Sequence, residues 1–147
     1  MIVRVAAAQA VLDRHHGRDF AWGERDCVRI GSDLLTELGI ASPLARARSY
    51  RNEAGAVRAL GALGFDSLSA AVDSIEGLTR IGHASALPAD LVAFKSALAA
   101  FDVSIGVVLS RGHALALLDD ADRAGGFKVV VLDRLDDALF AWRVSVG

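Results

Sequence analysis

The only cysteine of the chain, Cys27, follows Asp26 at the point where the apolar pattern predicts the start of a helix. A thiol in this position feels unpaired backbone N–H groups and the positive end of the helix dipole, which stabilise the thiolate and lower its pKa. The same N–H groups can donate hydrogen bonds to an oxyanion. Cys27 is therefore a candidate nucleophile, and the alternative for a lone cysteine is a buried, inert thiol.

A cysteine nucleophile needs a general base within hydrogen-bond reach, and histidine is the usual one. His15 and His16 fall at the end of the first predicted helix, where the helix dipole favours solvated histidines. His113 follows a Ser-Arg-Gly turn, so we expect it at a strand edge, facing solvent. His83 lies in a loop before Pro88 and is the histidine that could swing inward.

The other aromatic and acidic features each have a simpler interpretation. Trp22 and Trp142 either line a groove over the cysteine or pack in the core, and core packing is the commoner role. The acidic run at Asp119, Asp120 and Asp122 lacks the spacing and late glutamate of an EF-hand, so we interpret it as an exposed turn. We predict no metal and no cofactor, and one cysteine allows no internal disulfide.

Helical periodicity dominates the first half of the chain. Asp26 and Asn52 are suited to the N-cap positions of two of the predicted helices, and glycines follow several of the apolar stretches. The predicted helices cover residues 3–16, 28–38, 52–63 and 68–75. This pattern predicts a helical half over about residues 1–80.

The second half changes to short runs rich in β-branched and aromatic residues, separated by turn residues. The predicted strands cover residues 91–94, 103–109, 113–118, 127–132 and 140–146. Short connections favour antiparallel pairing. We therefore predict a single α+β domain over 1–147, whose helices pack on one face of a meandering sheet of about five strands formed by about residues 88–147.

Composition limits the classes of partner. The net charge is −2 and the arginines are scattered among acids, so we predict no nucleic-acid partner. A hydrophobic content of 53% is ample for one core, yet no apolar run approaches the ~20 residues of a membrane span. The N-terminus lacks the layout of a signal peptide, which predicts synthesis in the cytoplasm.

Short sequence motifs around the cysteine and elsewhere in the chain add a family resemblance. The segment Phe20-Ala-Trp-Gly23 precedes Cys27 by three residues, Tyr50-Arg-Asn-Glu-Ala-Gly-Ala56 follows the arginine-containing helix, and Ala141-Trp-Arg-Val144 closes the chain. Together they resemble a small family of phage and prophage proteins of unassigned function, related to the NlpC-type papain-like cell-wall peptidases. The resemblance covers nearly the whole chain and implies a papain-like, NlpC-type fold.

The resemblance also assigns expected positions to the parts of a peptidase site. In that superfamily an aromatic-Trp-Gly segment leads into an Asp-Cys pair, which Trp22-Gly23 and Asp26-Cys27 match, so Trp22 and Asp26 become substrate-groove candidates. A Gly-Asp turn then leads into the first strand, and Pro88-Ala-Asp-Leu-Val92 matches it with alanine in place of glycine.

The third part of the motif is a strand of the form His-Val-Gly-Ile-Tyr-Leu-Gly, whose histidine is the catalytic base. Ser104-Ile-Gly-Val-Val-Leu-Ser110 aligns with it and places Ser104 where the histidine is expected. Serine cannot take a proton from a thiol near neutral pH. In a hairpin, His113 would lie about 15 Å along the strand from Ser104, too far to replace it.

Three functions follow from these expectations. The first is a structural or assembly protein of a phage or prophage tail tip, located in the virion tail and contacting other tail proteins. The second is an active cysteine peptidase or amidase that opens peptidoglycan during phage entry, with Cys27 as nucleophile. The third is a cysteine-dependent acyl-transfer enzyme unconnected with phage. The serine at position 104 favours the first function.

Overall fold

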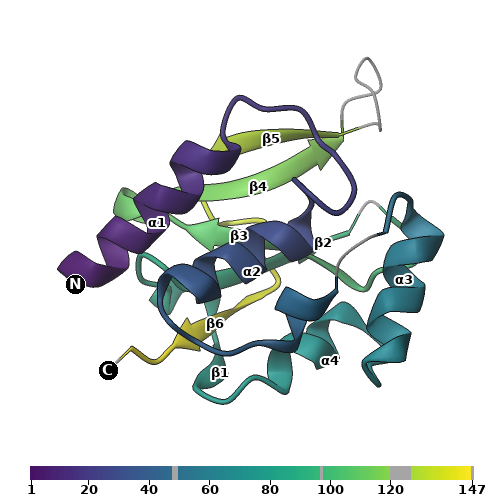
Figure 1. Cartoon of the computed structure of the whole chain (residues 1–147). Helices are drawn as coiled ribbons and strands as arrows, with labels where there is room; N and C mark the ends of the chain where they lie inside the picture. Colours follow the sequence, from purple (N-terminus) through teal and green to yellow (C-terminus); the bar gives the residue numbers. More distant parts are fainter. Residues whose placement is uncertain (48–49, 97, 120–126, 147) are drawn as a thin grey trace.

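The computed structural model of the chain describes residues 1–47, 50–96, 98–119 and 127–146, so the predicted turn at Asp120 and Asp122 lies outside the described residues. Helices and strands alternate little along the chain, as the sequence predicts (Figure 1). The α-helices are α1 (Ile2–His15), α2 (Cys27–Glu37), α3 (Glu53–Ala62) and α4 (Leu68–Asp73). The strands are β1 (Leu78–Ile81), β2 (Leu91–Lys95), β3 (Val103–Val108), β4 (Ala114–Asp119), β5 (Phe127–Leu132) and β6 (Phe140–Val144).

Side-chain caps fix the starts of the helices. Asp26 accepts a hydrogen bond from the backbone of Arg29 at the start of α2, and Asn52 does the same for Gly55 in α3, which confirms both predicted caps. Ser67 caps α4 in the same way. The predicted loop after α2 contains a short 3-10 helix, η1 (Pro43–Arg46), and two further 3-10 turns are η2 (His83–Ser85) and η3 (Ser110–Gly112).

The strands form one six-stranded antiparallel sheet in the order β1-β6-β2-β3-β4-β5. The meander that the sequence predicts is confirmed from β2 to β5, but β6 returns to pair with β2 on the opposite side from β3. The prediction of about five strands missed β1, which lies inside the predicted helical half. This strand has only four residues, pairs with β6 alone and exposes Thr79 and Arg80, so it carries no apolar signal.

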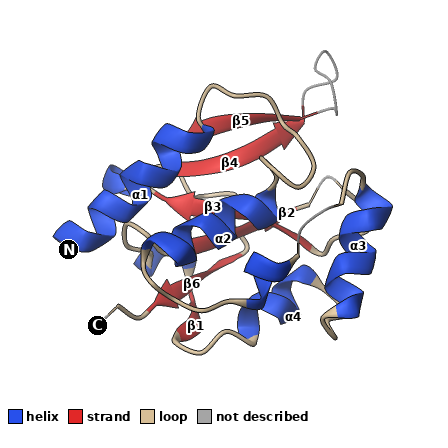
Figure 2. Ribbon diagram, viewed as in Figure 1, coloured by secondary structure: helices blue, strands red, loops and turns tan. Residues whose placement is uncertain are grey.

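The helices α1 and α2 cross one face of the sheet, while α3 and α4 lie beside it (Figure 2). Gly31 of α2 lets the helix approach β3 closely, since a Cβ there would lie 3.2 Å from the Ile105 side chain. The core between the helices and the sheet contains buried residues from the whole length of the chain, the first being Ala7 and the last Val144. A smaller cluster around Val92 and Ala141 occupies the other face.

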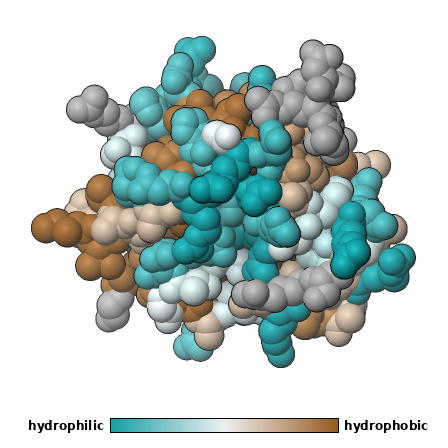
Figure 3. All heavy atoms as spheres, turned by 45° about the horizontal axis from the view of Figure 1, so that its top comes forward, coloured by the Kyte–Doolittle hydropathy of each residue, from teal (hydrophilic) through white to brown (hydrophobic). Residues whose placement is uncertain are grey.

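In the view of Figure 3, apolar side chains reach the surface in several places. Among the described residues, exposed apolar side chains gather at the N-terminal end of α1. Met1, Ile2 and Val3 expose 65%, 87% and 59% of their surfaces there. Among the described residues, no helix has both the length and the apolar content required to cross a membrane.

Candidate functional site

The segment before α2 is fixed by the carboxylate of Asp26. Oδ1 accepts a hydrogen bond from the backbone N–H of Arg29, and Oδ2 accepts from the backbone N–H of Gly23 and from the Tyr50 hydroxyl, at 2.7–2.8 Å. Asp26 is only 1% exposed. The carboxylate therefore holds Cys27 at the first position of the helix, and its oxygens are already occupied by the protein.

The backbone before α2 makes a tight turn at Gly23 that requires a glycine. Its φ is +78°, in the left-handed region, and a Cβ on it would lie 2.7 Å from the carbonyl oxygen of Tyr50. The tight turn brings Trp22 back over the start of α2, where its ring packs edge-on against Phe20 and Tyr50. The Trp-Gly and Asp-Cys pairs are thus one local structure.

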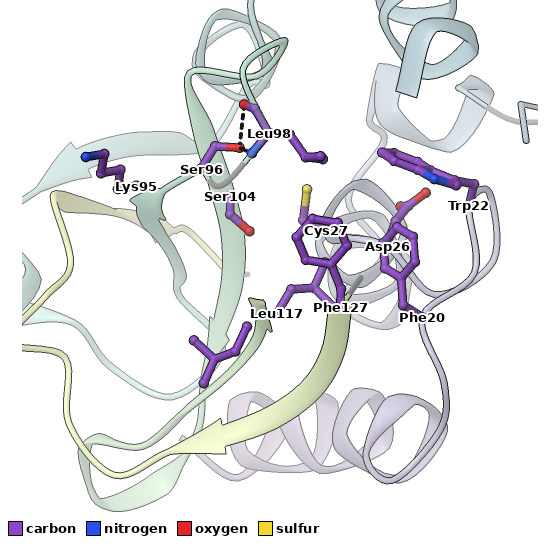
Figure 4. Close-up of a pocket in the computed structure, with 11 residues that line it drawn as sticks. Phe20, Trp22, Asp26, Cys27, Lys95, Ser96, Leu98, Ser104, Leu117 and Phe127 are labelled. Atoms are coloured by element: carbon purple, nitrogen blue, oxygen red, sulfur yellow. Dashed lines mark hydrogen bonds between the residues drawn. The ribbon is translucent and has the colours of Figure 1, made fainter. Parts of the chain in front are cut away.

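A pocket of about 110 Å³ opens beside Cys27, between the start of α2 and the sheet. Figure 4 shows the sulfur between the Trp22 ring and the strand that carries Ser104. The lining residues are Phe20, Trp22, Asp26, Cys27, Lys95, Ser96, Leu98, Ser104, Leu117, Leu118 and Phe127. The sequence prediction therefore brought together four true neighbours, Trp22, Asp26, Cys27 and Ser104.

Ser104 interacts directly with Cys27. The Ser104 hydroxyl and the backbone of Ile105 lie close enough to the sulfur to favour the thiolate. Burial of the thiol and the negative charge of Asp26 oppose them and are stronger, raising the pKa of Cys27 to about 12. The thiol is therefore the prevailing form at neutral pH. Of the two sequence interpretations of Cys27, the structure therefore agrees with the buried thiol, because Cys27 is only 5% exposed and adjoins a buried carboxylate that outweighs the helix dipole.

None of the four histidines, all of which the structure describes, lines this pocket. β4 reaches the pocket at Leu117 and Leu118, about 13–17 Å along the strand from His113. His113 itself is half-buried and borders a separate pocket together with residues of α1, instead of facing solvent fully. His83 lies in η2 and borders a separate surface hollow with Asp133.

The prediction of a solvated His15 is wrong, although His16 is exposed as expected. His15 is 1% exposed, and its Nε2 lies 2.7 Å from Oδ2 of Asp33 in α2. Burial favours a raised pKa for Asp33, but the hydrogen bond and charge of His15, with help from Arg14, lower it overall. The histidine therefore joins α1 to α2 and is not available to Cys27.

Polar groups of the pocket offer no substitute base. Lys95 lines the pocket, but Figure 4 shows its amine directed away from the sulfur. The Ser96 hydroxyl is engaged with the backbone of Leu98. Within the described part of the chain, no three His, Cys, Asp or Glu side chains are grouped so as to hold a metal ion.

The Pro-Ala-Asp segment lies outside the pocket and is a structural junction. Ala89 has φ +65°, in the left-handed region, and is the non-glycine residue with positive φ in the described chain. Asp90, fully buried, accepts hydrogen bonds from the backbone of Leu87 and Val144 and pairs with Arg143 at 2.8 Å. It also pairs with Arg4 of α1, so it connects the first helix to the last strand.

A sequence family described as a domain of unknown function, DUF6950, matches residues 4–144. The chain belongs to this family. No curated protein and no solved structure is significantly similar to the chain. The DUF6950 match begins at Arg4 in α1 and ends at Val144 in β6, so it includes every residue of the Cys27 pocket.

Other residues that line the Cys27 pocket could not be recognised as site residues from the sequence. Leu117 and Phe127 are ordinary apolar residues in the sequence, and they become pocket walls only because β3, β4 and β5 pair, whereas Leu98 reaches the pocket from the connection between β2 and β3. Of the two roles that the sequence left open for Trp142, groove lining and core packing, the structure shows core packing. The side chain is fully buried, and its indole N–H donates a hydrogen bond to Asp73 at 2.9 Å.

Proposed function

We propose that the chain is a tail component of a phage or prophage, in which a papain-like, NlpC-type fold serves as a structural or assembly part without cutting bonds. The observation that carries this proposal is the pair Cys27–Ser104: the residue that contacts the cysteine is a serine, where a hydrolase requires a base. The phage context rests on the sequence resemblance.

The geometry supports the relationship to papain-like proteins at three points. Cys27 begins the helix that packs against β3, and Ser104 on that strand contacts its sulfur, as the alignment with the histidine strand requires. Gly106, the glycine of the aligned motif, sits where a Cβ would lie 2.8 Å from the Leu115 carbonyl. Ala89 has the left-handed backbone of a glycine at the place where the superfamily has Gly-Asp.

The same geometry disfavours the alternative of an active peptidoglycan peptidase. The thiol is buried, its pKa is raised to about 12, and a neutral hydroxyl is its partner. Leucines at 117 and 118 occupy the β4 side of the pocket, so no polar group from that strand would orient a base. Thiolate formation and proton transfer to a leaving group both lack a residue to perform them.

An assembly role predicts dependence on the fold and not on the thiol. In the phage or prophage that encodes the chain, deletion of its gene is expected to abolish infective tails, and a Cys27→Ser copy is expected to restore them. Purified tails are expected to contain the chain in a fixed ratio to other tail proteins. Normal tails after deletion, or failure of a folded Cys27→Ser variant to restore them, would overturn the proposal.

A second assay addresses catalysis directly. Purified chain and its Cys27→Ala variant are incubated with peptidoglycan fragments, and released products are separated by mass. We expect no difference between the two proteins. Cleavage by the native chain that the variant lacks would establish the peptidase alternative.

A further inference from the structure

We propose that a second pocket, between the end of α1 and the start of α2, binds a phosphate group. This pocket has a volume of about 520 Å³ and lies on the other side of the 16–26 loop from Cys27. The proposal does not depend on the proposed tail function.

Positive charge gathers in this pocket although the chain as a whole has a net charge of −2. Arg14, Arg18, Arg25 and Arg29 all line it. The carboxylates in its lining are Glu24 and Asp33, so four guanidinium groups face two acids. A concave site with an excess of arginine attracts anions, and the planar guanidinium fork matches the oxygens of phosphate.

Arg29 is the central group of the argument. It is 5% exposed, and within the described residues no carboxylate lies at ion-pair distance from it. One terminal nitrogen donates to the carbonyl of Leu44 at 3.1 Å, whereas the buried Nε has no partner in the described chain. Buried charges are normally paired, so an unpaired guanidinium lining a pocket indicates an anion receptor.

His15 provides a second buried atom without a partner. Its Nε2 contacts Asp33, while Nδ1 is buried and has no hydrogen-bond partner in the described part of the chain. His15 lines the same pocket as Arg29, from the neighbouring helix. Arg29 and His15 thus bring incompletely paired buried side chains from two helices to the wall of one pocket, where the unneutralised charge of Arg29 attracts an anion.

The other three arginines of the pocket differ in how far their side chains are already paired within the protein. The Arg18 side chain is exposed and has no partner among the described residues. Arg25 donates its Nε to the Asp19 carbonyl and lies 3.6 Å from Glu24, a long contact that leaves its charge largely unneutralised. Arg14 is held by Asp33 and Glu37 at the rim. Arg18 is therefore free to close over a phosphate in the pocket, and Arg25 can do so by giving up its long contact with Glu24.

The test is a titration of the isotope-labelled chain with inorganic phosphate, at constant pH and ionic strength, followed by backbone amide NMR shifts. We expect saturable shifts confined to residues 14–29 and to Asp33. Arg18→Gln and Arg25→Gln are each expected to weaken phosphate binding at least threefold. Arg58→Gln, which removes an exposed arginine from α3, and Cys27→Ser are expected to leave it unchanged.

Two further ligands identify the source of the phosphate. Glycerol 3-phosphate binding more tightly than inorganic phosphate would indicate a phosphate carried by a larger molecule, and equal binding would indicate the free ion; both support the site. Glycerol without phosphate is expected to cause no shifts. Non-saturable shifts spread over the surface, or identical binding by the native chain and the Arg18→Gln/Arg25→Gln double variant, would overturn the proposal.

Discussion

The Tyr50 hydroxyl donates a 2.7 Å hydrogen bond to Oδ2 of Asp26, the residue that precedes Cys27 and caps α2. Burial, together with the charge and hydrogen bond of Asp26, raises the pKa of Tyr50, so the phenol remains a donor. The same carboxylate binds the backbone of Gly23. One side chain therefore joins three segments: the loop that carries Trp22, the helix that carries Cys27 and the stretch leading into α3.

Replacing Asp26 with alanine is expected to lower the free energy of unfolding by about 2–4 kcal/mol, because it removes an N-cap and leaves buried donors unsatisfied. Tyr50→Phe keeps the cap and is expected to cost about 1 kcal/mol. Asp13→Ala, which removes an exposed carboxylate from α1, is the control and is expected to cost under about 0.5 kcal/mol. Urea denaturation at pH 7 measures all three. Equal stability of the Asp26 and Asp13 variants would contradict the bridging role of Asp26.

The raised pKa of Cys27 predicts a loss of stability in alkali. The unfolded chain releases the thiol proton above about pH 8.5, whereas the folded chain retains it up to about pH 12. The contribution is therefore complete below pH 8.5 and declines by about 1.4 kcal/mol per pH unit above it. Between pH 7 and pH 10, the stability difference between the native chain and Cys27→Ala is expected to shift by about 2 kcal/mol against the native chain. A difference that stays constant over this range would show that the thiol titrates normally.

Ser104→His tests whether a base placed beside the sulfur would activate the Cys27 thiol. An imidazole at the position that contacts the sulfur is expected to lower the pKa of Cys27 and accelerate its alkylation by iodoacetamide at pH 8 at least tenfold. Ser96→His places an imidazole in the same pocket at a residue that hydrogen-bonds to Leu98, and it is expected to have much less effect. Similar acceleration by both variants would point to loosened packing instead of a Cys–His pair.

Ala89 and Ala93 are both fully buried alanines, but only Ala89 has a positive φ. Substitution by glycine removes a buried methyl group at each site, and at Ala89 it also relieves about 1 kcal/mol of left-handed strain. We expect Ala93→Gly, in the middle of β2, to cost about 1–2 kcal/mol, and Ala89→Gly to change stability by less than about 0.5 kcal/mol. Thermal or urea unfolding of the two variants measures the difference. Equal losses would mean that the Ala89 backbone carries no strain.

Much of the fold is predictable because its signals are local. Asp26 and Asn52 mark helix starts through side chains that reach a backbone N–H three residues later. The position of β6 between β1 and β2 depends on contacts between distant segments, which periodicity does not encode. The four residues of β1 carry too little apolar character to stand out, since Arg80 instead pairs with Asp73.

The candidate site likewise has some features that the sequence predicts and others that depend on how distant segments pack. The sequence resemblance singles out Ser104 together with Cys27, and both residues line one pocket. The direction of the Cys27 pKa shift does not follow from helix position, because burial and the neighbouring Asp26 charge outweigh the helix dipole. The buried His15–Asp33 pair was equally hidden, since a histidine near a helix end is solvated or buried according to how two helices pack.

The single buried cysteine also allows local opening of the structure to be measured through the reactivity of its thiol. Cys27 is the one sulfhydryl in the sequence, so a reagent that reacts with thiols reports on one location. Because Cys27 is only 5% exposed, the reagent reaches the sulfur after the walls of its pocket have moved, and its rate therefore measures how often they do so. Comparing that rate with global unfolding would distinguish a local fluctuation at the pocket from cooperative opening of the whole domain.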